Sequence, residues 1–111
     1  MRKYETIFIL DPTLDNNAIE AEISKYSAVI TANGGNILKQ DKWGLRNLAY
    51  HISKKSQGYY VFTLFEGKKE TLTELERVFG LDEQVLRHLT VVLGKKQVKA
   101  QEKTKELVAQ T

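Results

Sequence analysis

The order of the apolar patterns along this chain constrains its fold more than any other feature. Apolar residues recur at spacings of three and four between Ile19 and Ile30 and again between Leu72 and Phe79, which predicts two amphipathic helices. Four further runs are rich in β-branched and aromatic residues, as strands are: residues 4–10, 37–52, 59–65 and 86–93. The predicted order is therefore strand-helix-strand-strand-helix-strand.

Local signals set the limits of the first strand and the first helix. Asp11-Pro12 ends the strand, because proline has no N–H for the ladder, and Thr13 or Asp15 is suited to cap the helix that follows. Gly34-Gly35 ends the helix by allowing a positive φ. The first strand carries apolar residues on both faces, which favours a central place in a sheet.

The second strand is unusually long. It bends near Gly44, where the absence of a side chain permits a bend, and continues to Ile52. A polar turn over residues 53–58, with Lys54-Lys55 at its tip, leads to the third strand. These two strands are therefore expected to form a hairpin.

Capping signals also mark the second helix. Thr71, with Glu74 three residues later, predicts a capping box at its start, and Gly80 is expected just beyond its end. The residues that this helix should bury lie on one stripe, and they are Leu72, Leu75, Val78 and Phe79.

This order of elements permits few topologies when crossovers are right-handed and connections are short. We expect an α+β fold of the ferredoxin-like sandwich type, with a four-stranded antiparallel sheet in the order 4-1-3-2 and two helices on one face. The first strand is then central and the opposite face is open. The second strand lies at an edge, where it is free to pair with a partner.

The 111 residues fit one domain, which we place at residues 1–96, followed by a basic, disordered tail at residues 97–111. The chain has no cysteine, which excludes disulfides and thiolate metal sites. No apolar run reads as a signal peptide or a membrane span, so we expect a soluble, cytoplasmic protein.

The net charge of +3 is small, but the charge is unevenly distributed. Residues 36–58 hold five Lys or Arg against one Asp, and residues 95–105 hold five Lys against one Glu. Such basic stretches favour a polyanionic partner. The predicted helices are acidic instead, and pairing with neighbouring acids is expected for their basic residues Lys25, Lys68, Lys69 and Arg77.

The segment from Trp43 to Ile52 combines aromatic, apolar and cationic residues in one predicted strand. Leu48, Tyr50 and Ile52 share a face at a period of two, and Arg46 continues that row. A sheet face of this composition is suited to contact a partner. The candidate contacts to a partner protein are Trp43, Leu45, Leu48 and Tyr50.

The sequence offers little for catalysis or metal binding. The two histidines, His51 and His88, lie on different predicted strands, and no cluster of His, Asp or Glu has the spacing of a metal site. No nucleophile–base pair or glycine loop for phosphate is evident. We therefore expect no enzymatic activity, no cofactor, no metal and no small-molecule substrate.

A second interpretation is a free-standing single-stranded RNA-binding module of the RNA-recognition-motif type, which stacks bases on aromatic residues of its central strands. Gln57 and Tyr60 stand where that motif has a cation and a small residue. Alternation alone does not decide which aromatic residues face the helices. The rings in question are Tyr4, Phe8, Tyr59, Tyr60, Phe62 and Phe65.

Four segments together resemble the bacterial small-subunit ribosomal protein six family: Met1 to Glu5, Trp43 to Ile52, Gly58-Tyr59 and Val85 to Arg87. The pattern Gly-x-Arg-x-Leu-Ala-Tyr-x-Ile in the second of them is the specific signature. The likeness covers nearly all of residues 1–96.

The resemblance implies a ferredoxin-like structural protein of the small ribosomal subunit, without catalytic residues or a cofactor. It also implies binding to the central domain of the small-subunit ribosomal RNA together with the eighteenth small-subunit protein. Arg2, Arg46 and Arg87 fall where the family carries basic residues, whereas His51 stands where members often have proline. With the lysines that the charge pattern adds, the candidate RNA contacts are Arg2, Lys3, Arg46, Arg87, Lys95 and Lys96.

Overall fold

A computed structural model gives the fold over residues 1–52 and 55–93, of which residues 49–52 are described by their backbone alone. The elements are β1 (Arg2–Leu10), α1 (Asn16–Ala32), β2 (Asn36–Ile52), β3 (Lys55–Gly67), α2 (Lys69–Leu81) and β4 (Val85–Val92). The predicted order is confirmed. The predicted disordered tail and the candidate contacts Lys95 and Lys96 lie outside the described residues.

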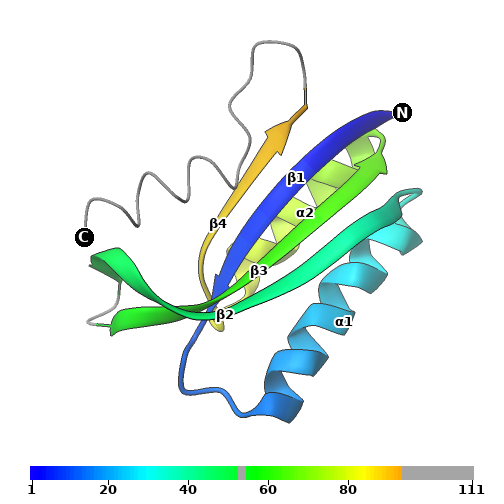
Figure 1. The fold of residues 1–111 in the computed structure, drawn as a ribbon. Helices are drawn as coiled ribbons and strands as arrows, with labels where there is room; N and C mark the ends of the chain where they lie inside the picture. The colour runs from blue at the N-terminus through cyan, green and yellow to red at the C-terminus, as the bar shows by residue number, and fades with distance from the viewer. Residues whose placement is uncertain (53–54, 94–111) are drawn as a thin grey trace.

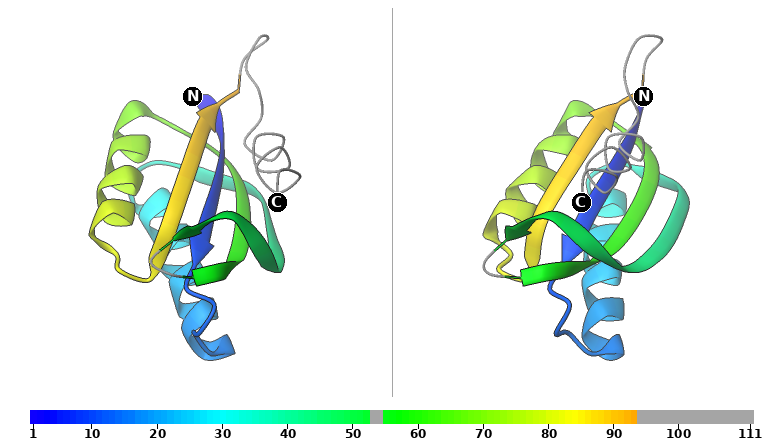
Figure 2. Two further views of the ribbon diagram at one scale, coloured as in Figure 1. Left: turned by 90° about the vertical axis from the view of Figure 1, so that its left-hand side faces the viewer. Right: turned by 60° about the vertical axis from the view of Figure 1, so that its left-hand side comes forward.

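The four strands form one antiparallel sheet in the order β2-β3-β1-β4, which confirms the predicted topology (Figure 1). β1 is central, and Tyr4 pairs with Phe65 of β3 and with Val92 of β4. Both helices cover the same face of the sheet, and Figure 2 shows the far end of the β2–β3 hairpin curling away from them. β3 begins at Lys55 rather than at the predicted Tyr59, because the hairpin ladder continues to Ile52 and Lys55.

The main core lies between this face and the helices. Phe8 of β1 meets Tyr26 of α1 and Phe79 of α2 at ring-centroid distances of 5.1 and 5.3 Å, and Tyr26 and Phe79 lie 4.4 Å apart. Such tilted and offset ring pairs add to the free energy gained from apolar burial. The other buried members of this cluster are Tyr4, Leu10, Ile19, Ile23, Ile30, Val61, Phe65 and Leu75.

The ends of α1 follow the sequence signals. Asp15 is the N-cap, and its Oδ1 accepts a hydrogen bond of 2.8 Å from the Ala18 N–H. Gly34 takes the left-handed conformation with φ of 83°. Gly35 is needed for a different reason, since a Cβ there would lie 2.7 Å from Ile30 Cγ2 and 2.8 Å from a methyl carbon of Thr71.

The predicted start of α2 is wrong. The helix begins at Lys69 with Lys68 as its N-cap, and the Lys68 N–H donates to Thr71 Oγ1 over 3.1 Å. Thr71 is fully buried and donates in turn to the Asn33 carbonyl at 2.6 Å, so it fastens α2 to the end of α1. Glu74 bonds Arg77 instead of capping.

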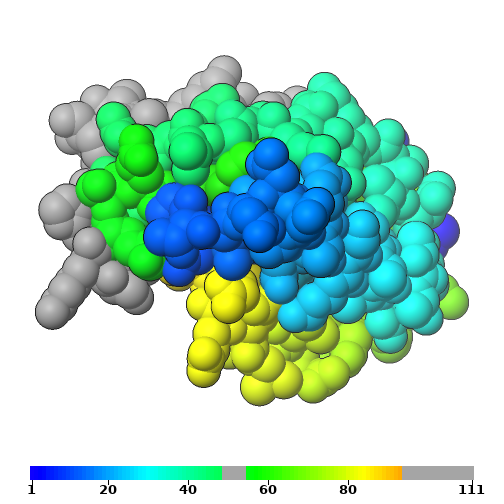
Figure 3. All heavy atoms as spheres, turned by 90° about the horizontal axis from the view of Figure 1, so that it is seen from below, coloured from blue at the N-terminus to red at the C-terminus, as the bar shows by residue number. Residues whose placement is uncertain are grey.

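The predicted end of α2 is also wrong, because Gly80 lies inside the helix and Asp82 is the C-cap. Asp82 Oδ2 accepts hydrogen bonds from the Tyr26 hydroxyl at 2.7 Å and from Lys25 Nζ at 2.9 Å. These bonds hold the α2–β4 connection against α1. Figure 3 shows the chain after β1 lying beside that connection and beside the start of β3, where Asp11 Oδ2 is 3.5 Å from Lys55 Nζ.

Glu22 on α1 shares a proton with Asp82. Burial raises the pKa of Glu22 to about 7, and the hydrogen bond to Asp82 and its negative charge add to the rise, against the opposing charge of Lys25. Burial alone would raise the pKa of Asp82, but hydrogen bonds from Glu22, Tyr26 and Lys25 outweigh it and hold that pKa below its usual range. Glu22 is therefore about half protonated near pH 7.

The face opposite the helices is less open than the sequence predicts. A second apolar cluster covers it, made of Ile7, Ile9, Leu48, Tyr60, Phe62 and Val91, all at 8% exposure or less. β2 bends at Gly44, which has a φ of 82°, and its register against β3 shifts there. The bend accompanies a close approach at Gly58, where a Cβ would lie 2.2 Å from Ile9 Cγ2 and 3.4 Å from Leu48 Cδ2.

The shared proton makes stability depend on pH. The folded pKa of Glu22 exceeds its ordinary value of 4.5, so the native state binds more protons between pH 4.5 and 7, and the free energy of unfolding falls as pH rises through that window. Glu22→Gln should leave the melting temperature at pH 5 nearly unchanged and, after allowance for solvent screening, raise it at pH 8 by about 2–4 °C. Calorimetry at both pH values measures this. Glu20→Gln, on the exposed side of α1, is the control, and equal shifts in the two variants would contradict the shared proton.

The contact at Gly58 gives a second prediction. Gly58→Ala should lower the free energy of unfolding by about 1–3 kcal/mol, because Ile9 must leave its position to admit a methyl group. Urea denaturation measures the change. Gly80→Ala is the matched control, since a Cβ there meets nothing within 4 Å and alanine is favoured in a helix. Wild-type stability of Gly58→Ala would show that the second cluster is loose.

Candidate nucleic-acid and protein interface

Arg46 of β2 is held in place by a stack of rings. Its guanidinium carbon lies 4.7 Å from the centroid of Trp43, and the Trp43 ring lies 5.6 Å from Phe62 at an interplanar angle of 6°. Phe62 is buried in the second cluster, so the stack rests on the sheet. A guanidinium that stacks by its face keeps its N–H edge available. Within the described residues, that edge meets no carboxylate.

Arg87 of β4 lies on the same face of the sheet. Ile9 of β1 pairs with Tyr60 on one side and with Arg87 on the other, so the three side chains form one row across the sheet. Arg46 pairs with Gly58, two residues from Tyr60, and belongs to the next row. Arg87 is exposed.

The hydroxyl of Tyr60 lies within the field of both arginines. Burial raises the pKa of Tyr60, and the positive charges of Arg46 and Arg87 each oppose that rise. Two candidate RNA contacts that are 41 positions apart in the sequence, 46 and 87, thus meet around one buried tyrosine. The sequence did not single out Tyr60 for this place, because β3 is apolar on both faces.

Arg2 and Lys3 do not join this pair. Arg2 pairs with Gly67 and Lys3 with Glu66, at the other end of the β1–β3 ladder. Seven residues of strand separate Arg2 from Ile9, or about 23 Å. The six predicted RNA contacts therefore divide into separate groups, of which Lys95 and Lys96 are not described.

The predicted protein contacts differ in exposure. Leu45 is 56% exposed and Trp43 is half-buried, whereas Leu48 is only 6% exposed because it packs into the second cluster. The side chain of Tyr50 lies outside the described residues. Leu38, at 43% exposure on the same strand, is a further apolar residue that the sequence pattern did not single out.

β2 is an edge strand. Among the described strands it is hydrogen-bonded only to β3, so its outer backbone groups are available for a partner. Leu45 and Leu38 lie along that strand. This arrangement suits a polypeptide that binds beside β2 and covers its apolar side chains.

The aromatic rings of β1 and β3 do not form a stacking platform. Tyr4, Phe8 and Phe65 are at most 3% exposed in the helix-side core, and Tyr59 packs against that core. The rings of the other face, Tyr60 and Phe62, are 3% and 4% exposed. Base stacking needs exposed ring faces, so the geometry gives no support to the RNA-recognition-motif alternative.

The described residues offer no metal site, and the described side chain of His88 is used for structure. No three His, Asp or Glu side chains of these residues are grouped so as to hold a metal ion. His88 Nδ1 lies 3.0 Å from Glu76 Oε2, and its ring stacks on Phe79 at 4.8 Å. Neither described helix has the length and apolar content to cross a membrane.

Comparisons with known proteins agree on one family. The family model for Ribosomal protein S6 matches residues 3–92. The chain is 43% identical over 95 residues to small ribosomal subunit protein bS6 of Clostridium acetobutylicum, covering 86% of this chain and all of that protein. It is 46% identical over 91 residues to the bS6 protein of Clostridium beijerinckii, covering 82% and 96%.

A solved structure agrees with these matches. The crystal structure of 30S ribosomal protein S6 from Thermotoga maritima has a TM-score of 0.79 against this fold at 27% sequence identity, covering 99% of this chain and 98% of that one. The fold, the family match and the relatives coincide over the described domain. The chain belongs to the ribosomal protein S6 family, whose members are non-enzymatic structural proteins of the small ribosomal subunit.

Proposed function

We propose that this small-subunit protein binds the central domain of the small-subunit ribosomal RNA together with the eighteenth small-subunit protein. The observation that carries the proposal is the placement of Arg46 and Arg87 on one sheet face beside an edge strand with exposed apolar residues. Both arginines lack an ion pair within the part of the chain described here, so their charges are available to phosphate.

The arginines suit phosphate rather than base edges. A guanidinium donates two parallel N–H bonds to a phosphate, and stacking on Trp43 fixes the Arg46 plane before RNA arrives. Preorganisation lowers the conformational entropy lost on binding. Release of counterions from the RNA then supplies much of the affinity, which makes binding dependent on salt.

The edge of β2 suits the protein partner. Leu45 is exposed and precedes Arg46 in β2, with its side chain on the other face of the strand, so a polypeptide along this edge would lie close to the RNA without covering Arg46. Burying the leucine favours association by removing apolar surface from water.

The RNA contact is tested by charge reversal. Arg46→Glu and Arg87→Glu should each weaken binding to a central-domain RNA fragment, in the presence of the partner protein, by about tenfold or more. Each should also lower the slope of log affinity against log salt by about one. Filter binding over a salt series measures both quantities. Arg77→Glu, which reverses a charge on α2 away from this face, should change neither.

Unchanged RNA binding by Arg46→Glu and Arg87→Glu, with native circular dichroism, would overturn the RNA part of the proposal. Loss of the native spectrum would instead show a structural role. That outcome is not expected, because Arg87 is exposed and Arg46 covers the Trp43 ring from outside.

The protein contact is tested at the edge strand. Leu45→Asp should weaken association with the eighteenth small-subunit protein about tenfold, because it replaces exposed apolar surface by a charge that must be desolvated. Isothermal titration calorimetry measures the affinity. Leu81→Asp is the matched control, since Leu81 is 71% exposed at the end of α2. Equal affinities of the two variants would place the partner elsewhere.

A further inference from the structure

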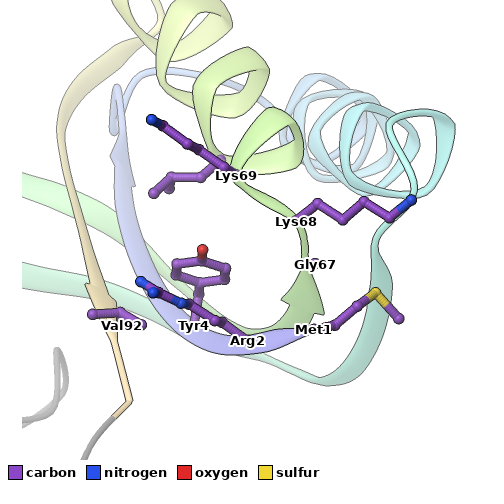
Figure 4. A pocket seen from close by; sticks show the side chains of 8 residues that line it. Met1, Arg2, Tyr4, Gly67, Lys68, Lys69 and Val92 are labelled. Carbon is purple, nitrogen blue, oxygen red and sulfur yellow. The ribbon is translucent and has the colours of Figure 1, made fainter.

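A hollow of about 530 Å³ lies between the start of β1 and the N-terminus of α2 (Figure 4). It is far from the Arg46–Arg87 pair, which sits at the other end of β1. Its walls combine cations, an aromatic hydroxyl and apolar side chains. The lining residues are Met1, Arg2, Tyr4, Gly67, Lys68, Lys69, Leu72 and Val92.

Tyr4 has a hydroxyl without a hydrogen-bond partner among the described residues. The residue is 3% exposed, and its ring stacks on Phe65 at 5.3 Å. No group of the described residues makes a hydrogen bond to its hydroxyl. Figure 4 shows the hydroxyl pointing from β1 into the hollow, between Arg2 and Lys69. The hydroxyl opens into the hollow and no described side chain accepts from it, so a ligand in the hollow can accept its hydrogen bond.

The charges around this hydroxyl are all positive. Arg2, Lys68 and Lys69 form no ion pair with any described residue, although the sequence predicts that helix lysines pair with neighbouring acids. Figure 4 shows the Arg2 guanidinium beside the Tyr4 ring and Lys69 above the hydroxyl with its amino group turned away from it, and the amino group of Lys68 points away on the other side. Lys68 therefore contributes charge and not contact.

The start of α2 adds to this positive potential. The Thr71 and Leu72 N–H groups bond to the Lys68 carbonyl, which leaves the N–H groups ahead of them without acceptors inside the helix. The helix dipole places partial positive charge at this end. Glu70, the acid of the first turn, lines a neighbouring hollow with Asn33, Thr73 and Glu74, and Lys69 lies between the two hollows.

We propose that this hollow binds a phosphate group. The ligand must be an anion, because three cations without ion pairs line the hollow beside a helix N-terminus, and it must accept a hydrogen bond from a hydroxyl. A phosphate meets both conditions: one oxygen can accept from Tyr4, and the others from Arg2 and Lys69. We assign this phosphate to the backbone of the ribosomal RNA, an assignment that rests on the proposed function.

The position of the hollow makes it a second anchor. About 23 Å of strand separates it from the Arg46–Arg87 face, so one nucleotide cannot reach both. The hollow is open to solvent, so a phosphate of an RNA chain can enter it from the surface without the end of the RNA passing through the protein. Two anchors on a rigid sheet would fix the orientation of the protein on RNA and not only its attachment.

The first experiment uses inorganic phosphate and the folded protein alone. Phosphate should shift the backbone amide resonances of Lys69 and Glu70 saturably, and Tyr4→Phe and Lys69→Gln should weaken that response about three- to tenfold. Tyr59→Phe and Arg77→Gln are the matched controls, because they remove a hydroxyl or a charge outside the hollow. Absence of a saturable shift in the wild type would overturn the site.

The second experiment uses the central-domain RNA fragment with the partner protein over a salt series. Lys69→Gln should lower the salt slope by about one, and Tyr4→Phe should lower affinity about three- to tenfold without changing the slope. Phosphate binding without any effect of these variants on RNA would overturn the RNA assignment and leave a site for free oxyanions. Effects of these variants alongside normal binding by Arg46→Glu and Arg87→Glu would support the hollow and overturn the proposed sheet-face contact.

Discussion

The burial of β1 on both faces is the constraint on which the rest of the structure depends. Phe8 and Leu10 enter the helix-side core, while Ile7 and Ile9 enter the second cluster. A strand that is apolar on both faces can be satisfied only at the centre of a sheet covered on both sides. The helices cover one side, and the bent β2–β3 hairpin brings Leu48 to the other. Gly58 permits the approach of Ile9 that this arrangement requires.

This double burial decides where binding groups can lie. The aromatic rings of the central strands are used in packing, so cations and apolar residues at the margins of the sheet are left to meet partners. Arg46 and Arg87 reach the same face from strands on opposite sides of β1 and β3. The Arg46–Trp43–Phe62 stack links the two roles, because its inner ring belongs to the core and its outer group carries the charge.

Much of the fold follows from local signals in the sequence, and the errors come from distant contacts. Periodicity, Asp15 and Gly34 predict α1 correctly because each acts within a few residues. The start of α2 is mispredicted because Thr71 bonds to Asn33, which is remote in sequence. The candidate site is predictable to the level of its arginines. The placement of Arg46, Arg87 and Tyr60 on one face is not predictable. Tyr60 lies in a strand that is apolar on both faces, so alternation does not show which face its side chain occupies.

Tyr4 is not identified as a binding residue by the sequence pattern, because its ring also has a role in packing. Its ring is needed in the core against Phe65, and any large apolar residue would satisfy that role. Tyrosine differs from phenylalanine there only by a hydroxyl that no described residue accepts from. The fold gains no hydrogen bond from this hydroxyl, whereas an oxyanion held by Arg2 and Lys69 would give it a partner. In the proposed phosphate site this hydroxyl, near the start of β1, would serve binding and not folding.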